Sequence, residues 1–264
     1  MAMHRIKNYA LVTGASSGIG LAISRELARR GYPLLMVSNE KEKLNEAATE
    51  IQAEFTVKVR ILHMDLAQAD SAQNLFDYCE ENSIQTEILV NNAGIFFFSD
   101  VIATPSFRME TMINLHVLTP AMLCRLFAKK MAESGTKGYI LNISSASAWM
   151  LMPGIALYSA TKSFLYCFSR AMRNEVFDQG ISITAICPGA VATNLYRLSP
   201  RYTKLGIFLG IIITPERLAR QSLDKMFKRK TLYIPNACIN RFFVFLVKTM
   251  PETIVRWIKK RISQ

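Results

Sequence analysis

Short apolar runs alternate with longer segments of mixed polarity along the first quarter of the chain. Tyr9–Thr13, Pro33–Ser38 and Val57–His63 are such runs, and each predicts a buried strand. Leu21–Arg30 and Lys41–Phe55 lie between them and have the pattern of helices. An alternation of strands and helices is typical of a parallel sheet covered by helices on both faces. The pattern therefore predicts a doubly wound α/β domain.

The same alternation continues to the last strand, which we expect at Thr231–Ile234. The intervening predictions are helices at Ser71–Asn82 and Ala156–Phe177 and a strand within Gly138–Ser144. A chain of 264 residues fits one such domain better than two. We expect a catalytic domain at 1–235, with 236–264 as an apolar and basic helical extension of it.

Charge is unevenly distributed along the chain. The net charge is +12, and residues 215–264 carry 12 Lys and Arg against 3 Asp and Glu, whereas residues 1–214 carry 20 against 17. A local basic excess suits contact with a membrane surface, an acyl carrier or a phosphate-bearing ligand, although a solvated basic face has the same composition. The basic residues form no recognisable nucleic-acid module with exposed aromatics, so we expect no nucleic-acid partner.

The cysteines and histidines argue against a disulfide framework and a metal site. The five cysteines include no Cys-x-x-Cys pair, and each sits in an apolar segment, which predicts buried free thiols in a reducing cytoplasm: Cys79, Cys124, Cys167, Cys187 and Cys238. The three histidines are scattered, so we expect no bound metal. The first residues lack an apolar signal-peptide core. The predicted location is cytoplasmic, with a peripheral membrane position as the alternative.

Small polar residues follow successive predicted strands. The first strand leads into Gly14-Ala-Ser-Ser-Gly18-Ile-Gly20 and then a helix, an arrangement in which helix N–H groups can hold a phosphate. Similar residues follow the later strands: Ser38-Asn39, Asp65, Asn91-Asn92-Ala93-Gly94, Ser144-Ser145 and Pro188-Gly189. Each alone is an ordinary turn signal. Together they predict a ligand site beyond the carboxyl ends of the strands.

Tyr158 and Lys162 are four residues apart in a predicted helix and so share one face. An ammonium beside a phenol favours the phenolate and lowers the phenol pKa from its usual value of about 10. A tyrosine of this kind is a usable general acid. Taken alone, the pair is as readily a surface contact, but it follows the serines that close the Gly138–Ser144 strand.

The chain resembles the short-chain dehydrogenase/reductase family over nearly all of its length. The motifs occur in order and at family spacing: Thr13-Gly-Ala-Ser-Ser-Gly-Ile-Gly20, Asp65-Leu66, Asn91-Asn-Ala-Gly94, Asn114, Ser145, Tyr158-x-x-x-Lys162 and Pro188-Gly-Ala-Val-Ala-Thr193. The resemblance implies a single Rossmann-like domain of about seven parallel strands. It also implies an NAD(P)-dependent oxidoreductase that transfers a hydride between nicotinamide and a carbonyl or alcohol carbon.

The resemblance assigns four catalytic residues. Tyr158 would protonate the carbonyl oxygen, and Ser145 would donate a hydrogen bond to it. Lys162 would lower the tyrosine pKa and hold the ribose hydroxyls, and Asn114 would fix a water that links Lys162 to solvent. Ser144 competes for the serine role, but Ser145 lies thirteen residues before the tyrosine, which is the family's usual separation.

The resemblance also implies the cofactor contacts. They are Gly14, Ser16, Ser17, Gly18, Ile19, Gly20, Ser38, Asn39, Asp65, Leu66, Asn92, Ala93, Gly94, Tyr158, Lys162, Pro188, Gly189, Val191 and Thr193. Asn91 and Gly94 would shape the floor beneath the cofactor, and Thr193 with the Pro188-Gly189 turn would hold the nicotinamide amide.

Cofactor preference depends on the end of the second strand. Relatives place there an acid that selects NAD, or just after it an arginine that selects NADP, whereas this chain has Ser38 and Asn39. Because Ser38 cannot repel a 2′-phosphate and Lys41 and Lys43 follow, we expect NADP(H) to be preferred over NAD(H). Those lysines have the alternative interpretation of a solvated helix face.

Bulky apolar residues flank the predicted catalytic residues and favour a lipophilic substrate. Phe96, Trp149 and Met152 are the predicted substrate-lining residues, although loop packing explains them equally well. We expect NADPH-dependent reduction of a 3-keto lipid or acyl-type compound. The alternatives are a steroid or small-polyol dehydrogenase, a non-catalytic nucleotide-binding module, and a membrane-peripheral scaffold.

The C-terminal segments have several interpretations. Leu205–Ile213 occupies the place of a substrate loop in relatives, and Thr214-Pro215-Glu216 has the N-cap, proline and acid of a helix start. Ile239–Met250 is too short to span a bilayer. A last helix from Pro251 would carry an apolar stripe with basic neighbours that suits an anionic membrane surface, the core or another subunit. The family resemblance favours a homodimer or homotetramer.

Overall fold

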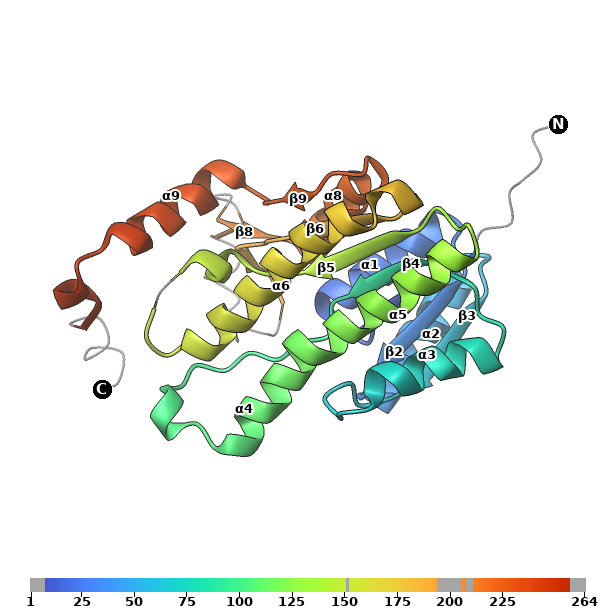
Figure 1. Ribbon diagram of the computed structural model, residues 1–264, viewed down its shortest axis with the longest axis horizontal. Coiled ribbons are helices and arrows are strands. Elements are labelled where there is room, and N and C mark those ends of the chain that lie inside the picture. Colours follow the sequence, from blue (N-terminus) through green and yellow to red (C-terminus); the bar gives the residue numbers. More distant parts are fainter. Residues whose placement is uncertain (1–7, 151, 194–205, 208–210, 257–264) are drawn as a thin grey trace.

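The computed structural model describes residues 8–150, 152–193, 206–207 and 211–256. Its centre is a sheet of seven parallel strands in the order β3-β2-β1-β4-β5-β6-β9 (Figure 1). The strands are β1 (Tyr9–Thr13), β2 (Leu34–Ser38), β3 (Val59–His63), β4 (Thr86–Asn91), β5 (Tyr139–Ile143), β6 (Ser182–Ile186) and β9 (Leu232–Tyr233). Beside it, β7 (Ala190–Val191) and β8 (Ile212–Ile213) form a two-stranded parallel sheet.

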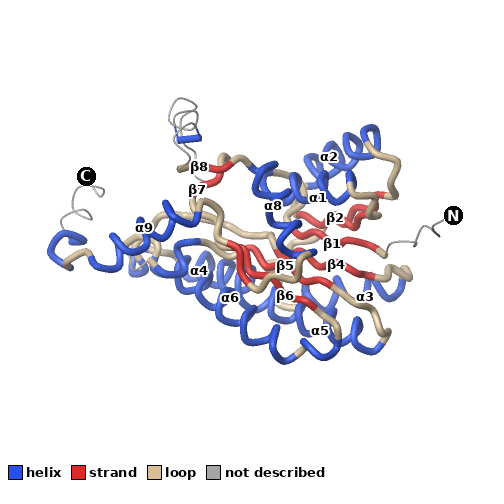
Figure 2. Tube along the Cα trace, turned by 90° about the horizontal axis from the view of Figure 1, so that it is seen from above, coloured by secondary structure: helices blue, strands red, loops and turns tan. Residues whose placement is uncertain are grey.

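Helices cover both faces of the seven-stranded sheet (Figure 2). One layer contains α1 (Gly18–Arg29), α2 (Lys41–Glu54) and α8 (Pro215–Phe227), and the other contains α3 (Ser71–Glu81), α5 (Thr119–Glu133) and α6 (Ala156–Glu175). Because both faces are covered, β2 and β6 are buried at every residue, which explains the apolar run of β2. The predicted doubly wound, Rossmann-like architecture is confirmed, and the element ends lie within three residues of the predictions.

The strand order places the ends of β1 and β4 at the point where the chain reverses direction across the sheet. β1 pairs with β2 on one side and with β4 on the other, and later strands extend outward from β4. The connections that follow two such neighbouring strands run in opposite directions across the sheet. A crevice therefore forms between them, beyond the carboxyl ends of the strands. The fold therefore brings the polar turns predicted from the sequence to one edge.

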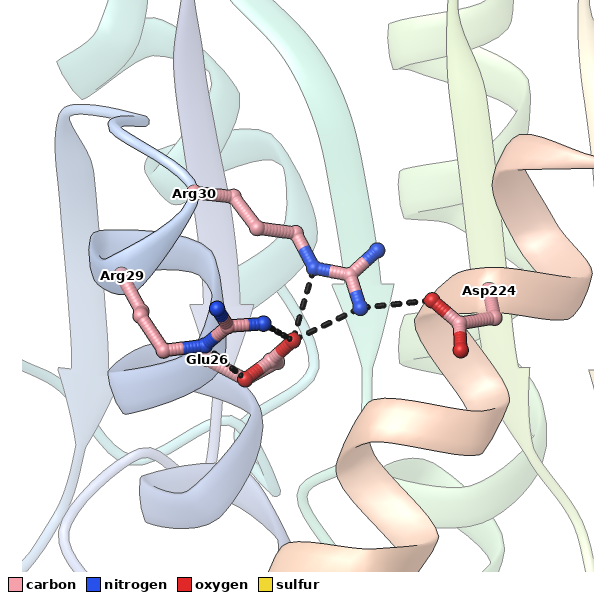
Figure 3. A network of polar contacts seen from close by, with 4 residues as sticks. All are labelled: Glu26, Arg29, Arg30 and Asp224. Carbon is pink, nitrogen blue, oxygen red and sulfur yellow. Dashed lines mark hydrogen bonds and ion pairs between the residues drawn. The ribbon is translucent and has the colours of Figure 1, made fainter.

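A cluster of charged groups fixes α1 against α8 (Figure 3). Glu26 accepts hydrogen bonds from Arg29 and Arg30, and Arg30 Nη2 lies 2.7 Å from Asp224 Oδ1 on α8. The hydrogen bond from Arg29, together with Arg30, lowers the pKa of the Glu26 carboxyl against the opposing effect of burial. This network joins residues almost two hundred positions apart and lies away from the carboxyl ends of the strands.

Three of the five cysteines are buried, as predicted, and two are not. Cys79, Cys124 and Cys187 are buried free thiols, whereas Cys167 on α6 and Cys238 on α9 (Ala237–Thr249) are exposed. The prediction was wrong for those two because their helices turn these positions outward, even though the neighbouring residues are apolar.

Among the described residues, the helical stretch Ser106–Glu133 is long and apolar enough to cross a membrane by length and composition. It comprises α4 (Ser106–Ile113), the π-helical segment η2 (Asn114–Leu118) and α5. Half of its most apolar window is buried, and α5 contributes Leu123 and Phe127 to the core. We interpret this stretch as a core element of the α/β domain.

The C-terminal elements agree in part with the predictions. Thr214 caps α8, since its hydroxyl accepts from the Arg217 N–H at 3.3 Å. After β9, α9 packs against the 3-10 helix η3 (Ala146–Trp149) and then reaches away from the sheet (Figure 1). Residues 252–256 begin the predicted last helix, and the remainder of its apolar stripe lies outside the described residues, as do residues 205 and 208–210 of the predicted substrate loop.

Candidate active site

A groove of about 470 Å³ lies at the carboxyl edge of the sheet. Its wall includes these predicted cofactor and catalytic residues: Gly14, Ser16, Ser17, Gly18, Ile19, Ser38, Asn39, Asp65, Leu66, Asn92, Ala93, Gly94, Ser145, Tyr158, Lys162, Pro188, Gly189, Val191 and Thr193. Gly20, Asn114 and the three predicted substrate-lining residues are not in the wall. Segments separated by up to 180 positions therefore converge on one ligand-sized space.

The glycine-rich turn after β1 is packed too closely to tolerate side chains. A Cβ on Gly14 would lie 2.9 Å from the Ala93 Cα, and one on Gly20 would lie 2.0 Å from the Gly14 carbonyl oxygen. Gly14 also has a φ of +63°, which residues with a Cβ rarely adopt. Gly20 thus acts beneath the turn, where it lets α1 approach closely, and Ser17, Gly18 and Ile19 at the start of α1 face the groove.

Two asparagines at the end of β4 have different positions. Asn92 faces the groove, and its Nδ2 donates to the Thr13 carbonyl at 2.9 Å and so ties β4 to the glycine turn. Asn91 is buried below, where its Nδ2 donates to Asn142 Oδ1 at 2.8 Å. Asn91 therefore supports the floor of the groove from below, whereas Asn92 and Gly94 form part of the groove surface.

Tyr158 and Lys162 lie together at the start of α6. They are 6% and 5% exposed, and the Lys162 Nζ lies 5.8 Å from the centroid of the Tyr158 ring. The Nζ donates to the Ile143 carbonyl at 3.1 Å. Burial lowers the pKa of Lys162 from 10.5 to about 8, so the ammonium form still predominates at neutral pH. A buried cation is thus held against the phenol ring.

The two adjacent serines are distinguished by their contacts. Ser144 Oγ donates to the Lys162 carbonyl at 2.7 Å, a contact that joins β5 to α6. Ser145 Oγ accepts from the Ser147 N–H at 3.1 Å, which caps η3 and leaves the hydroxyl proton for a partner in the groove. The catalytic role of Ser145 stays a prediction.

Asn114 lies at the first position of η2. Its Nδ2 donates to the Ala67 carbonyl at 3.0 Å, which ties the α4–α5 junction to the loop after β3. Its neighbours Leu115 and His116 are in the groove wall. The water-holding role implied by the family resemblance stays a prediction.

The predicted substrate-lining residues lie beside the groove. Phe96 packs edge-on against the Tyr158 ring, with centroids 5.0 Å apart, and so borders the predicted catalytic tyrosine. Trp149 packs edge-on against Tyr166 on the outer part of α6, at 4.7 Å. Met152 is half-buried in the loop that leads into α6. Phe96 has the strongest claim of the three to a substrate contact.

Two polar residues of the groove wall were not predicted from the sequence. Glu40, the residue before α2, lines the end of the groove near β2. His116 lies beside Tyr158, with ring centroids 5.7 Å apart. Glu40 carried a usable signal, because it is an acid two residues after Ser38, but the predicted cofactor preference rested on Ser38, Asn39 and the lysines at 41 and 43. His116 carried none, because its neighbours in space come from distant segments.

The Glu40 carboxylate is held by donors around the groove end. Ser16 Oγ donates to Glu40 Oε2 at 2.9 Å, and Ser38 Oγ donates to Ser16 Oγ at 2.9 Å. Lys43 Nζ lies 2.5 Å from the other carboxylate oxygen. These hydrogen bonds, that of Lys43 first, lower the pKa of Glu40, which keeps the carboxylate ionised.

The fold and groove define a nucleotide-binding oxidoreductase of the Rossmann-like class. The family model for short chain dehydrogenases matches residues 8–201, and the chain belongs to this family of oxidoreductases. It is 34% identical over 201 residues to very-long-chain 3-oxoacyl-CoA reductase-A of Danio rerio, a match that covers 74% of this chain and 61% of that protein. It is 36% identical over 199 residues to 17-beta-hydroxysteroid dehydrogenase type 3 of Mus musculus, covering 74% and 64%.

Among solved structures, the chain resembles a short-chain dehydrogenase from Sphingobium yanoikuyae in complex with NADPH. The TM-score is 0.77 at 26% identity, over 92% of this chain and 96% of that one. The glycine-rich turn and the N-terminus of α1 form part of the groove wall, where helix N–H groups can hold a phosphate, and this arrangement fits an NAD(P) cofactor.

Proposed function

We propose that the protein reduces a 3-keto group on a lipophilic acyl compound with a nicotinamide cofactor. The observation that carries the proposal is that Ser145, Tyr158 and Lys162 line one groove together with the glycine turn. A non-catalytic nucleotide-binding module has no need of a buried cation held against a phenol. The similarity to very-long-chain 3-oxoacyl-CoA reductases supports the acyl class of substrate.

In the proposed reduction, each of the catalytic residues has a separate role. When bound, the cofactor supplies the hydride. The Tyr158 hydroxyl donates a proton to the carbonyl oxygen, and the Ser145 hydroxyl donates a hydrogen bond to the same oxygen as charge develops on it. The Lys162 ammonium stabilises the resulting tyrosinate. Asn92, Gly94 and the Pro188-Gly189 turn shape the walls that hold the cofactor.

The substrate class is tested by comparing a long-chain 3-oxoacyl thioester with a short-chain analogue that has the same head group. We expect kcat/KM to be at least about tenfold higher for the long chain, because each buried methylene contributes ~0.8 kcal/mol. Consumption of NADH or NADPH measures both rates. Equal rates would contradict an acyl site.

A steroid substrate is the second candidate. The similarity to a 17-beta-hydroxysteroid dehydrogenase favours it, and the apolar ring of Phe96 against Tyr158 suits a rigid ring system as well as a flexible chain. Measuring kcat/KM for a 17-ketosteroid in the same assay distinguishes the acyl candidate from the steroid candidate. The preferred substrate class should give the higher kcat/KM.

For cofactor preference, we infer that Glu40 favours NAD(H). The sequence predicted NADP(H) because Ser38 supplies no carboxylate, and that preference stays untested by the comparisons. The Glu40 carboxylate lies in the groove wall two residues further on, and Lys43, which had favoured a 2′-phosphate, is paired with it. A carboxylate repels a phosphate and accepts hydrogen bonds from a ribose diol.

We also propose that α9 rests on an anionic membrane surface. Phe242, Phe245 and Leu246 are spaced along one helical face and are 62%, 64% and 43% exposed. The side of the helix that faces the domain brings Asn240 against the Gly189 turn at the groove edge. The 12 Lys and Arg against 3 Asp and Glu in residues 215–264 complement anionic lipid. A cytoplasmic protein with peripheral membrane contact fits these features.

Sedimentation with phosphatidylglycerol vesicles at low salt tests the membrane contact. The wild type should bind, and a Phe242→Ser/Phe245→Ser double variant should bind at least about tenfold more weakly, since two large apolar side chains no longer insert. The control is Phe177→Ser, which changes an equally exposed phenylalanine beyond the far end of α6. If α9 instead joins two subunits, the double variant will alter the oligomeric state and no vesicle binding will be seen.

A further inference from the structure

His116 is a buried titratable residue to which the proposed chemistry gives no role. It lies in η2, the π-helical segment between α4 and α5, and is 1% exposed. Single turns of π-helix are uncommon and occur frequently at functional sites, since the extra residue redirects a side chain. Here the redirected side chain enters the groove wall between the end of β4 and the start of α6.

Both ring nitrogens of His116 are engaged. Nε2 accepts from the backbone N–H of Ile95 at 3.0 Å, and Nδ1 lies 3.1 Å from Thr161 Oγ1. Because the Ile95 N–H is a donor, Nε2 must be the unprotonated nitrogen and the ring proton must be on Nδ1. Thr161 Oγ1 then accepts from Nδ1 and donates its own proton to the Tyr158 carbonyl at 2.8 Å. The donor and the acceptor of each of these three hydrogen bonds are therefore fixed.

The surroundings of the ring keep it neutral and closely packed. Burial, and next the charge of Lys162, lowers the pKa of His116 well below its usual value of 6.5. The ring packs edge-on against Tyr158, which also makes an edge-on contact with Phe96. A Cβ on Gly94 would lie 2.9 Å from His116 Nε2, so the glycine lets the floor of the groove approach the ring.

We propose that His116 is a positioning residue, whose Nδ1–H tautomer connects the groove wall at Gly94–Ile95 to the first turn of α6 and so orients the Tyr158 phenol. The inference rests on the proposed role of Tyr158 as proton donor. These hydrogen bonds connect the β4 side of the groove, at Ile95, to the α6 side, at the Tyr158 backbone carbonyl. Both sides of the groove must be correctly placed relative to the carbonyl group of the substrate. Misplacing a reacting group by about 1 Å can lower a rate about 100-fold, so a connection of this kind matters for turnover.

Thr161→Val tests the connection without touching the groove, because Thr161 is buried and is not in its wall. Valine keeps the shape and removes the hydroxyl, which leaves the Tyr158 carbonyl and His116 Nδ1 unconnected. We expect kcat to fall roughly 10-fold to 100-fold, with KM and cofactor Kd changed less than about threefold. Thr161→Ser, which restores the hydroxyl, should recover most of kcat.

Two histidine variants and one control complete the test. His116→Phe fills the ring volume without polar atoms and should match Thr161→Val, whereas the amide oxygen of His116→Gln can accept from the Ile95 N–H and should recover part of kcat. The control is Thr184→Val, which removes an equally buried hydroxyl from β6, where it donates to the Lys230 carbonyl. It should lower Tm without changing kcat.

A measurement that needs no substrate separates this inference from the proposed function. Ultraviolet difference titration of each protein against the same protein carrying Tyr158→Phe gives the pKa of the Tyr158 phenol. Thr161→Val should shift this pKa by about half a unit or more as the phenol moves relative to Lys162. An unchanged phenol pKa, a kcat within twofold of wild type, or a loss that Thr161→Ser fails to recover would overturn the positioning role, whichever ketone the enzyme reduces.

Discussion

Replacing Tyr158 with phenylalanine is expected to lower kcat by about 10³-fold to 10⁴-fold and to leave the cofactor Kd within about twofold. The hydroxyl is the proposed proton donor to the substrate oxygen, and no other acid among the described groove residues lies against the buried Lys162 cation. A loss of this size corresponds to about 4–5.5 kcal/mol of transition-state stabilisation. The phenyl ring keeps the edge-on contacts with Phe96 and His116, so the fold and the groove should be retained.

Single-turnover kinetics and cofactor titration check this expectation on the same preparation. Tyr166→Phe is the matched control, because Tyr166 lies two turns further along α6 and its hydroxyl accepts from Arg170 outside the groove. It should retain wild-type turnover. Tyr158→Phe with more than about a tenth of wild-type kcat would rule out the tyrosine as the principal acid.

The sequence predicted the sheet and its helical layers well, because burial imposes a pattern that one chain can display. β2 is buried at every residue, and the apolar run Pro33–Ser38 predicted it because it is long enough for a buried strand and too short for a helix. The carboxyl-edge residues were found for a related reason: parallel strands end at one edge, so the turns after them must gather there. Knowledge of the strand order was not needed for that conclusion.

The contacts between distant segments could not be predicted from the sequence. His116 gains its role from Ile95 and Thr161, which are 21 and 45 residues away, and only the fold brings them together. Trp149 shows the same limit. It lies between Ser145 and Tyr158 in the sequence, but in the fold it packs on Tyr166 and is not in the groove wall. Its predicted substrate contact stays a prediction.

Glu40 shows that a carboxylate can reach the cofactor groove from a position other than the end of β2. The prediction of NADP(H) assumed that a carboxylate must stand at the end of β2, at Ser38. In the fold, β2 ends at Ser38, and the backbone N–H of Glu40 donates back to Ser38 Oγ at 3.2 Å. This turn brings the Glu40 carboxylate beside Ser16, within the groove wall. The longer side chain two residues on thus brings a carboxylate into the same hydrogen-bonded cluster as the Ser16 and Ser38 hydroxyls.

Glu40→Gln is accordingly expected to raise the affinity for NADP(H) relative to NAD(H) by about 10-fold to 100-fold. Two unit charges 4 Å apart interact by ~4 kcal/mol at an effective dielectric constant of 20 and by ~1 kcal/mol in bulk water. The Glu40 side chain is 41% exposed, so the repulsion of a 2′-phosphate should lie between these limits, at about 1–3 kcal/mol. The amide also frees Lys43 to approach the phosphate.

Isothermal titration of both reduced cofactors measures the ratio directly and requires no knowledge of the substrate. Glu42→Gln removes the same charge from a position on α2 that is exposed and outside the groove, so it controls for the change in net charge. Wild-type protein should bind NADH more tightly than NADPH, and Glu42→Gln should behave like wild type. Tighter binding of NADPH by the wild type, or an equal change of ratio in both variants, would show that Ser38 and the surrounding cations decide the preference, as the sequence first predicted.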